Sequence, residues 1–396
     1  MIPLGPITST LGTVYTSDQV QSFLFGSSLT PSWYFDLLGP DFAYKTDLNS
    51  SVDFSRPPII DYDSTRAVKR TLRGLTIRAQ SGVDQQRDLI RVRFRIPSPD
   101  GGYLEWQVGT FMMQTPKRVI YEGITWWTLD APDLSQKLAR AAFGGVGLVQ
   151  STSVGTGLAG LAQAGSGYPA VISALVASYG GITPLSADVP EPANKIPADL
   201  VFDIGSSYLK AINDLLAAIV YTGVYATAGV MTSRPLANYA YVQTLLTLDT
   251  IAGSAQLFGP FSEAVDPSTA FNKAFVLSED PRRAPIKGYY ENTSPDSAVS
   301  LVNADPFLTV IRDSKIASEL AAFYRARAVV QEAARVYAVL SVGIPPFPFF
   351  EDLDVVQLVW QSVDEGVVNQ PYLVLRYQHT CGLAATTLDL QRVVPV

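Results

Sequence analysis

Residues 89–96 alternate strictly between apolar and basic side chains, and this pattern constrains the fold more than any other feature of the chain. In an extended segment the apolar members share one face and the basic members share the other: Ile90, Val92, Phe94 and Ile96 against Arg91, Arg93 and Arg95. A period of two with one apolar face is typical of the wall of a β-barrel or β-sandwich. The segment is therefore predicted to be a strand with a core side and a basic side.

Turn residues follow this strand and divide the next stretch into further strands. Residues 98–102 read Ser-Pro-Asp-Gly-Gly, in which proline presets φ, aspartate bonds its own backbone and glycine permits a positive φ. Glu122 and Gly123 form a second tight reversal. Their flanks, residues 119–121 and 124–129, are predicted to pair as a hairpin.

Charged residues are sparse and unevenly placed. They make up 16% of the 396 residues, below the quarter or so that is usual in soluble domains. Because charge is depleted from interface cores, this favours a surface that meets other subunits over a neutral-surfaced monomer. Residues 64–95 hold nine Lys or Arg and two Asp, whereas residues 1–63 hold seven Asp and two Lys or Arg. These opposite blocks can pair within one subunit or between subunits.

The overall charge and the single cysteine limit the partners and the compartment. A formal net charge of −7 argues against general binding to nucleic-acid phosphates, although not against a channel through which DNA passes. One cysteine excludes an internal disulfide and is consistent with cytosolic synthesis. The first residues lack the features of a signal peptide, and no apolar run approaches the ~18 residues of a membrane span. We expect no membrane insertion by this chain.

The middle of the chain mixes small residues with helical patterns. Residues 144–167 are rich in Gly, Ser and Ala and predict a flexible loop or an interface arm. A helix is predicted over 168–179 and a short strand over 200–203. Ser206 or Ser207 is placed to cap a further helix, whose apolar residues share a face: Leu209, Ile212, Leu216 and Ile219.

Strands are predicted to dominate again from residue 239 onward, with one long helix between them. That helix is predicted over 316–341, because apolar residues recur on one broad face: Ile316, Leu320, Phe323, Val330, Tyr337 and Leu340. Gly343 and the proline-rich residues 345–348 provide a normal helix stop. Strands over 355–360, 372–378 and 388–394 are predicted to close the chain.

Few groups suggest covalent chemistry. His379 is the only histidine and lies two residues from Cys381, so in a strand both side chains would point the same way. A Cys-His pair is one interpretation, but no nucleophile motif accompanies it. A plain strand histidine beside a small buried thiol is favoured. Carboxylate pairs for glycoside hydrolysis can be drawn freely from 36 acidic residues, so their presence carries no information.

Cofactor and metal sites are not predicted either. Glu351, Asp352 and Asp354 cluster after the proline-rich loop and offer oxygen ligands for a hard cation, but they lack the calcium-loop spacing. A solvated turn is favoured. The glycines of 144–167 lack the preceding strand and the Lys-Ser/Thr of a phosphate loop. We predict no catalytic, cofactor-binding or metal site, and a protein that is not an enzyme.

The order of motifs over 58–138 resembles a known family. Residues 59–77 give a strand, an aspartate, the run Ser-Thr-Arg-Ala-Val-Lys-Arg-Thr and a second strand, and Gly109-x-Phe111 follows. Residues 125–138 then give an aromatic strand, an Asp-rich turn and a Ser-x-Lys-Leu helix start. Together these resemble the first barrel of tail hub proteins (baseplate hub, tail-tip hub or minor tail proteins) of long-tailed bacteriophages. Residues 180–216 and the helix over 316–341 fit more loosely, and 144–167 departs from the family.

The resemblance implies a mainly β protein with α+β parts. It would contain two tail-tube-like β-barrel or sandwich domains flanked by helices, plus a small α/β domain. The predicted division is an N-terminal arm and start of the first barrel (1–57), the first barrel (58–143), a flexible insertion (144–167), the α/β domain (168–235) and a second barrel containing the long helix (236–396).

The function implied by the resemblance is structural. The chain would be a homotrimeric tail hub that caps the distal end of the tail tube, joins it to tail-tip or fibre proteins and surrounds the DNA exit channel. Its partners would be the tube or a distal tail protein, tip or fibre proteins and the tape measure protein, with DNA only in transit. It would reside at the tail tip of the virion after assembly in the host cytoplasm. The alternatives are a tail tube or distal tail adaptor protein, a tail-borne carbohydrate-active enzyme, and a monomeric binding module.

The basic face of strand 89–96 suggests the only candidate site residues. In a ring, Arg91, Arg93 and Arg95 would face the acidic surface of a neighbouring subunit, such as the Asp-rich stretch over 36–63, or would line the lumen. The alternative is an exposed strand face that charge keeps soluble.

Overall fold

The structure is a computed structural model, and it describes residues 6–25, 30–79, 82–141, 147–148, 167–180, 196, 201–202, 205–227, 230–236, 244–251, 257, 270–279, 284–334, 340–362, 366–382 and 386–393. Its helices are α1 (Ser17–Leu24), α2 (Ser135–Arg140), α3 (Tyr168–Gly180), α4 (Tyr208–Ala218) and α5 (Glu319–Ala333). The strands of the first third are β1 (Ile7–Thr8), β2 (Val14–Tyr15), β3 (Ser32–Leu38), β4 (Tyr44–Asp47), β5 (Ile59–Asp63), β6 (Arg70–Arg78), β7 (Leu89–Pro97), β8 (Tyr103–Met112), β9 (Gln114–Tyr121) and β10 (Ile124–Pro132). The later strands are β11 (Gly147–Leu148), β12 (Val201–Phe202), β13 (Tyr225–Thr227), β14 (Val230–Thr232), β15 (Leu246–Asp249), β16 (Lys273–Ser278), β17 (Ile286–Glu291), β18 (Leu308–Arg312), β19 (Leu340–Ile344), β20 (Val355–Ser362), β21 (Gly366–Thr380) and β22 (Thr386–Arg392).

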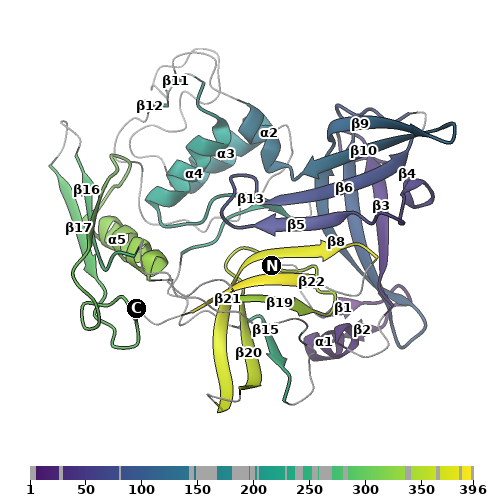
Figure 1. Cartoon of the computed structure of the whole chain (residues 1–396). Helices are drawn as coiled ribbons and strands as arrows, with labels where there is room; N and C mark the ends of the chain where they lie inside the picture. Colours follow the sequence, from purple (N-terminus) through teal and green to yellow (C-terminus); the bar gives the residue numbers. More distant parts are fainter. Residues whose placement is uncertain are drawn as a thin grey trace.

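Two sheets form the main body. The larger has nine strands in the order β15-β20-β21-β5-β6-β10-β9, with β22 also paired to β21 and β19 paired to β22. The smaller has four strands in the order β4-β3-β7-β8. Strand β21 joins the early and late parts of the chain, because it pairs antiparallel with β5 as well as with β20 and β22. Figure 1 shows these early and late strands side by side.

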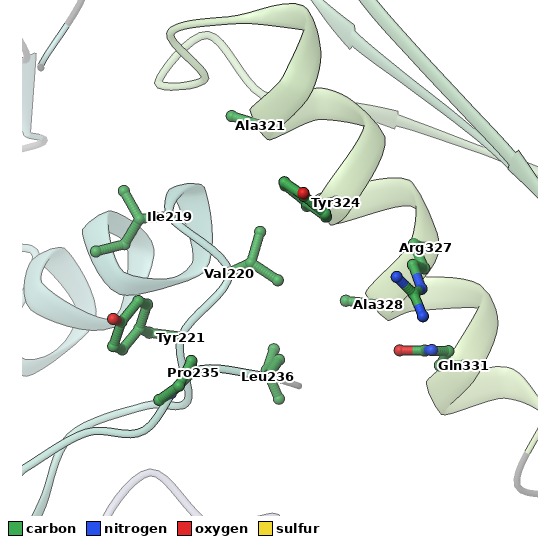
Figure 2. A pocket seen from close by; sticks show the side chains of 10 residues that line it. All are labelled: Ile219, Val220, Tyr221, Pro235, Leu236, Ala321, Tyr324, Arg327, Ala328 and Gln331. Carbon is green, nitrogen blue, oxygen red and sulfur yellow. The ribbon is translucent and has the colours of Figure 1, made fainter. Parts of the chain in front are cut away.

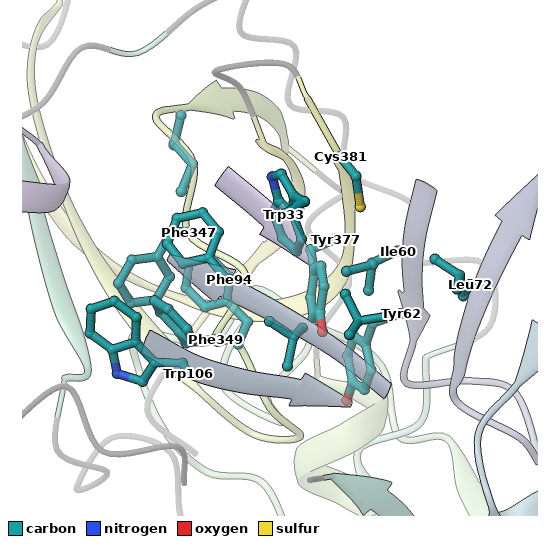
Figure 3. Packing of buried hydrophobic residues seen from close by; sticks show 14 of the residues in the cluster. Trp33, Ile60, Tyr62, Leu72, Phe94, Trp106, Phe347, Phe349, Tyr377 and Cys381 are labelled. Carbon is teal, nitrogen blue, oxygen red and sulfur yellow. The ribbon is translucent and has the colours of Figure 1, made fainter. Parts of the chain in front are cut away.

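One hydrophobic core lies between these two sheets. The alternation of β7 predicts it, and the structure confirms that prediction: Ile90, Val92, Phe94 and Ile96 are all 0% exposed. Rings from both ends of the chain meet there, with Phe94 packed on Trp33 at 4.9 Å and on Phe349 at 5.6 Å between centroids. Figure 3 shows Phe347 and Tyr377 in the same cluster. The early and late segments are therefore held by shared packing as well as shared hydrogen bonds.

The predicted turns are present. Gly101 has a φ of +83°, and Glu122 and Gly123 have φ values of +48° and +76°. Two successive residues with positive φ make a two-residue hairpin turn whose twist matches the flanking strands. The turn joins β9 to β10, which pair in register from Ile124 and Tyr121 onward, and the hairpin extends to the edge of the molecule in Figure 1.

Helices α2, α3 and α4 pack into a second core. The side-chain hydroxyl of Ser207 accepts from the backbone N–H of Lys210 and so caps α4, as the sequence predicts. The predicted apolar face of α4 is buried, with exposures of 8% or less: Leu209, Ile212, Leu216 and Ile219. Strand β11 pairs antiparallel with β12, and apart from β11 and Gly167 the predicted insertion over 144–167 lies outside the described residues.

A smaller lobe consists of α5 on a sheet of order β17-β16-β18. The prediction of a helix over 316–341 is wrong in extent, because α5 ends at Ala333 and Leu340 begins β19. The predicted apolar face is confirmed only in part, since Ile316 and Val330 are 0% exposed but Leu320 is 60% exposed. The helix instead presents its small residues to the sheet. The reason is close approach: a Cβ added at Gly288 of β17 would lie 2.2 Å from the Ala322 carbonyl carbon.

The fold class is the one predicted: mainly β with α+β parts. The division into an arm, two barrels, an insertion and an α/β domain stays a prediction. The pairing of β5 with β21 means that the segments 58–143 and 236–396 share a continuous sheet.

Candidate functional site

The arginine row of β7 is paired within its own chain. In the register of the four-stranded sheet, Asp36 of β3 lies opposite Arg91. The Asp36 carboxylate is fully buried and accepts from Arg91 Nε at 2.9 Å and from Arg93 at 2.7 Å. One desolvated carboxylate therefore binds two guanidinium groups, and the acidic and basic blocks of the sequence meet inside one subunit.

Glu105 of β8 extends this pairing to the other neighbouring strand. It lies opposite Arg95 in the register, binds the Arg95 Nε, and accepts from Arg93 at 2.9 Å. The ring of Tyr34 lies 4.0 Å from the Arg95 guanidinium carbon, a cation–π geometry. Burial lowers the pKa of Arg93, but its hydrogen bonds to Asp36 and Glu105 outweigh this and raise it above its ordinary value.

The three arginines thus form a ladder across β3, β7 and β8, which we call the arginine ladder. The side chains of Arg91, Arg93 and Arg95 are 29%, 18% and 24% exposed, respectively. A role for these arginines at an interface or in a lumen stays a prediction. Only the exposed part of each side chain could contact a neighbouring subunit or face the lumen. Asp36 belongs to the acidic stretch that the sequence offers as a partner for these arginines, but it was not singled out there, and Glu105 was missed.

The three carboxylates after the proline-rich loop are not in a solvated turn. Glu351, Asp352 and Asp354 are 2–3% exposed, which corrects the sequence-based interpretation. Arg234 binds Glu351 and Asp354 at 2.7 Å each and donates to the Asp352 carbonyl at 2.8 Å. Lys69 binds the Asp352 carboxylate. These cations lie more than a hundred positions away in sequence, so no local signal indicates the burial.

Burial shifts the titration of this cluster. Desolvation raises the pKa of Asp354 from 3.8 to about 6, although the Arg234 guanidinium opposes the shift. Desolvation likewise raises the pKa of Tyr62, whose hydroxyl donates to Asp352 at 2.6 Å. In the part of the chain that the structure describes, no group of three or more His, Cys, Asp or Glu is arranged to hold a metal ion. Ion pairs join the 351–354 loop to Lys69, which directly precedes β6, and to the segment after β14. The hydrogen bond from Tyr62 joins the same loop to β5.

A second pair of buried polar side chains joins β6 to β21 and β10 to the start of α2. Arg70 of β6 is 2% exposed and donates to the Tyr377 hydroxyl at 2.9 Å. Asp133 is 1% exposed and accepts from the backbone N–H of Ser135 at 2.8 Å, at the start of α2. Burial raises the pKa of Asp133. These bonds have a structural role, because they hold adjacent elements together.

His379 and Cys381 are both 0% exposed. The Nδ1 of His379 lies 2.6 Å from the Thr386 hydroxyl oxygen, and its ring packs on Trp33 at 4.6 Å between centroids. Burial lowers the pKa of His379 to about 3 and raises that of the Cys381 thiol. A neutral, stacked imidazole and a protonated thiol in the core fit the plain interpretation that the sequence favours.

Exposed apolar residues gather at three places that sequence reasoning did not separate. The β9–β10 hairpin tip exposes Val119, Ile120 and Tyr121 at 39%, 62% and 65%. The sheet of the smaller lobe exposes Tyr289, Phe307, Leu308 and Val310, and α5 exposes Leu320 and Tyr324. Gathered exposed apolar side chains of this kind are a feature of interaction sites in soluble proteins. We call the first of these the hairpin tip.

Comparisons place the fold among tail proteins. A tail protein from Neisseria meningitidis MC58 is similar over 91% of this chain and 96% of its own, with a TM-score of 0.60 and 12% identity. The 43 kDa tail protein of prophage MuSo2 from Shewanella oneidensis is similar over 91% and 98%, at 0.56 and 10%. A prophage tail protein from Listeria monocytogenes EGD-e is similar over 90% and 94%, at 0.53 and 11%. This chain therefore has the fold of these tail proteins across almost its whole length.

Other comparisons are negative. No protein-family profile matches the chain, and no curated protein matches it. Within the described residues, the structure contains no helix that is both long enough and apolar enough to span a membrane.

Proposed function

We propose that this chain is a structural protein of a phage-type tail, and that within the tail it is the hub. The observation that carries the proposal is the whole-length likeness of fold to the tail protein from Neisseria meningitidis, which spans 91% of one chain and 96% of the other. Because the likeness spans 91% of this chain, it extends beyond a single barrel. A lone tube-type barrel would match only part of the chain.

The surface supports an assembling protein. Only 16% of the residues are charged, and the arginine ladder uses three of those charges inside the subunit. Within the described residues, β9 pairs with β10 alone and so ends the nine-stranded sheet, and the hairpin has an apolar tip. An unpaired edge with apolar side chains is suited to bind another chain.

In the hub, three copies would form a ring around the DNA exit channel at the distal end of the tail tube. The ring would contact the tube or a distal tail protein on one side and tip or fibre proteins on the other, with the tape measure protein as a further partner. The location would be the tail tip of the virion. The protein would act through assembly geometry and not through catalysis.

Mass and imaging of the purified chain test this proposal. Light scattering on a size-exclusion column is expected to give three times the chain mass of 42.8 kDa, and negative-stain images are expected to show a ring with a central hole. A long tubular polymer would indicate a tube protein instead. A stable monomer that digests cell-wall polysaccharide, and loses that activity when one carboxylate pair is changed, would indicate an enzyme.

The hairpin tip allows a sharper test. Replacing Val119, Ile120 and Tyr121 by Ser is expected to weaken the oligomer at least tenfold while leaving the thermal midpoint of the subunit unchanged. The matched control is Val367→Ser, because Val367 is 61% exposed at the end of another strand. An oligomer equally stable in the triple variant and in the control would remove the hairpin tip from the interface.

A further inference from the structure

A trench runs between α5 and residues 219–236. Two adjoining cavities of about 240 and about 570 Å³ form it, and both are lined by Tyr221, Leu236, Ala328 and Gln331. Figure 2 shows Arg327 and Gln331 on α5 facing Val220 and Leu236 across the first cavity. The trench is thus bounded by a helix of the smaller lobe on one side and by the end of α4 and the segment after β14 on the other.

The α5 wall carries two polar side chains that each have a buried nitrogen without a hydrogen bond. Gln331 is 7% exposed, and its Nε2 makes no hydrogen bond. Arg327 lies one helical turn before it, and its buried Nε likewise makes no hydrogen bond. The described residues provide no carboxylate to Arg327, whose guanidinium carbon lies 6.0 Å from the Tyr290 ring. A buried donor without an acceptor destabilises a fold, so this arrangement is costly unless something else accepts from it.

The other walls are apolar or already neutralised. Ile219, Val220, Pro235 and Leu236 line the side facing Arg327. In the second cavity, Lys69 and Asp352 are bound to each other, and Glu332 is exposed. Among the charged groups that line the trench, Arg327 is therefore the cation whose charge no described carboxylate balances.

We propose that the trench binds a carboxylate-bearing apolar segment of a partner protein, with Arg327 and Gln331 donating to the carboxylate. Guanidinium groups bind carboxylates in a fork of parallel hydrogen bonds, and a side-chain amide one turn away supplies a further donor. Apolar residues beside the carboxylate would pack on Val220 and Leu236. The occupant is a polypeptide because the first cavity continues into the second, which gives length for more than one residue. That the partner is a tail protein rests on the proposed function.

Peptide binding to the isolated chain tests the proposal. The probe is a fluorescent, capped pentapeptide with Glu between flanking leucines, and the matched probe carries Gln in place of Glu. Fluorescence polarisation is expected to show the Glu peptide binding at least about tenfold more tightly than the Gln peptide. Equal binding of the two peptides, or no binding of the Glu peptide up to about 5 mM, would refute the proposal. N-acetylglutamate binding as tightly as the peptide would refute a polypeptide occupant.

Two variants and one control complete the test. Arg327→Gln and Gln331→Leu are each expected to weaken the Glu peptide at least about tenfold, whereas Arg325→Gln, on the same helix but outside the cavity lining, is expected to bind normally. Gln331→Leu is expected not to lower the thermal midpoint, because it removes an unpaired buried amide; a purely structural Gln331 would give the opposite result. Binding that survives Arg327→Gln would overturn the proposal. Since the assay uses the isolated chain, its outcome is independent of the ring measurement that tests the proposed function.

Discussion

Arg234 is the residue whose removal is expected to test the buried charge cluster most directly. It binds Glu351 and Asp354 at 2.7 Å each, and both carboxylates are nearly inaccessible to water. Replacing it with Met keeps an unbranched apolar stem but leaves two buried negative charges without their cation. Removing one partner of a buried ion pair costs about 3–5 kcal/mol, so Arg234→Met is expected to lose about that much stability at pH 8.

The pH dependence follows from Asp354. Its pKa is 3.8 when free of the fold and about 6 in the folded protein, so the folded state binds the proton more tightly. Stability from this group is present below about pH 4 and is lost as the pH rises to about 6, a change of about 3 kcal/mol. Without the Arg234 guanidinium, which lowers this pKa, the value rises further. Each added unit corresponds to about 1.4 kcal/mol, so the deficit of the variant is expected to shrink by at least that amount between pH 8 and pH 5.

Urea unfolding at pH 8 and pH 5 measures both effects. Fluorescence and circular dichroism are followed together, so that coincident transitions justify comparing free energies. Arg312→Met is the control, because its ion pair with Glu279 is exposed, at 73% and 55%, and is expected to contribute less than about 1 kcal/mol. A deficit for Arg234→Met below about 1 kcal/mol at pH 8, or one that is equal at both pH values, would refute the reasoning.

Three further predictions concern the rest of the fold. Asp36→Asn leaves two guanidinium groups of the arginine ladder without their buried carboxylate, and it is expected to lower the free energy of unfolding in urea by about 2–4 kcal/mol. The control Asp47→Asn, on the exposed neighbouring strand, is expected to be nearly neutral. Gly288→Ala forces the backbone of α5 away from β17 and is expected to lower the thermal midpoint and open the smaller lobe to protease. Gly223→Ala is the milder control, because the atoms nearest to its new methyl group belong to a side chain and lie 3.2 Å away. Cys381, buried with a raised pKa, is expected to react with an aromatic disulfide reagent at the rate of global unfolding; rapid labelling of the native protein would contradict its placement.

Local signals were sufficient for several strands, turns and helix starts. The alternation of β7, the positive φ at Gly123 and the cap at Ser207 all depend on residues within a few positions of one another, and the structure contains each of them. The end of α5 was not predictable in the same way. Leu340 continues a helical pattern as readily as a strand, and its pairing with Leu390 in β22 depends on a partner fifty positions away.

The burial of the 351–354 loop could not be predicted for the same reason, and here the partners lie still farther away in the sequence. Three acidic residues after a proline-rich stretch are typical of a solvent-exposed turn. Their burial is tolerable only because Arg234 and Lys69, which come from distant parts of the sequence, pair with them. Fold class was predictable because periodicity is local. The electrostatic cluster was not, because its stability belongs to pairs that the sequence separates.

The arginine ladder changes which residues can report on assembly. Reversing all three charges to Glu would place them against Asp36 and Glu105 of the same subunit, so the loss of an oligomer would follow from damage to the four-stranded sheet alone. The hairpin tip has the opposite property, since its side chains are exposed and contribute little to the core of the subunit. The arginine ladder and the hairpin tip therefore lie in different sheets, so substitutions at the hairpin tip can test association without removing the ion pairs that hold β3, β7 and β8 together.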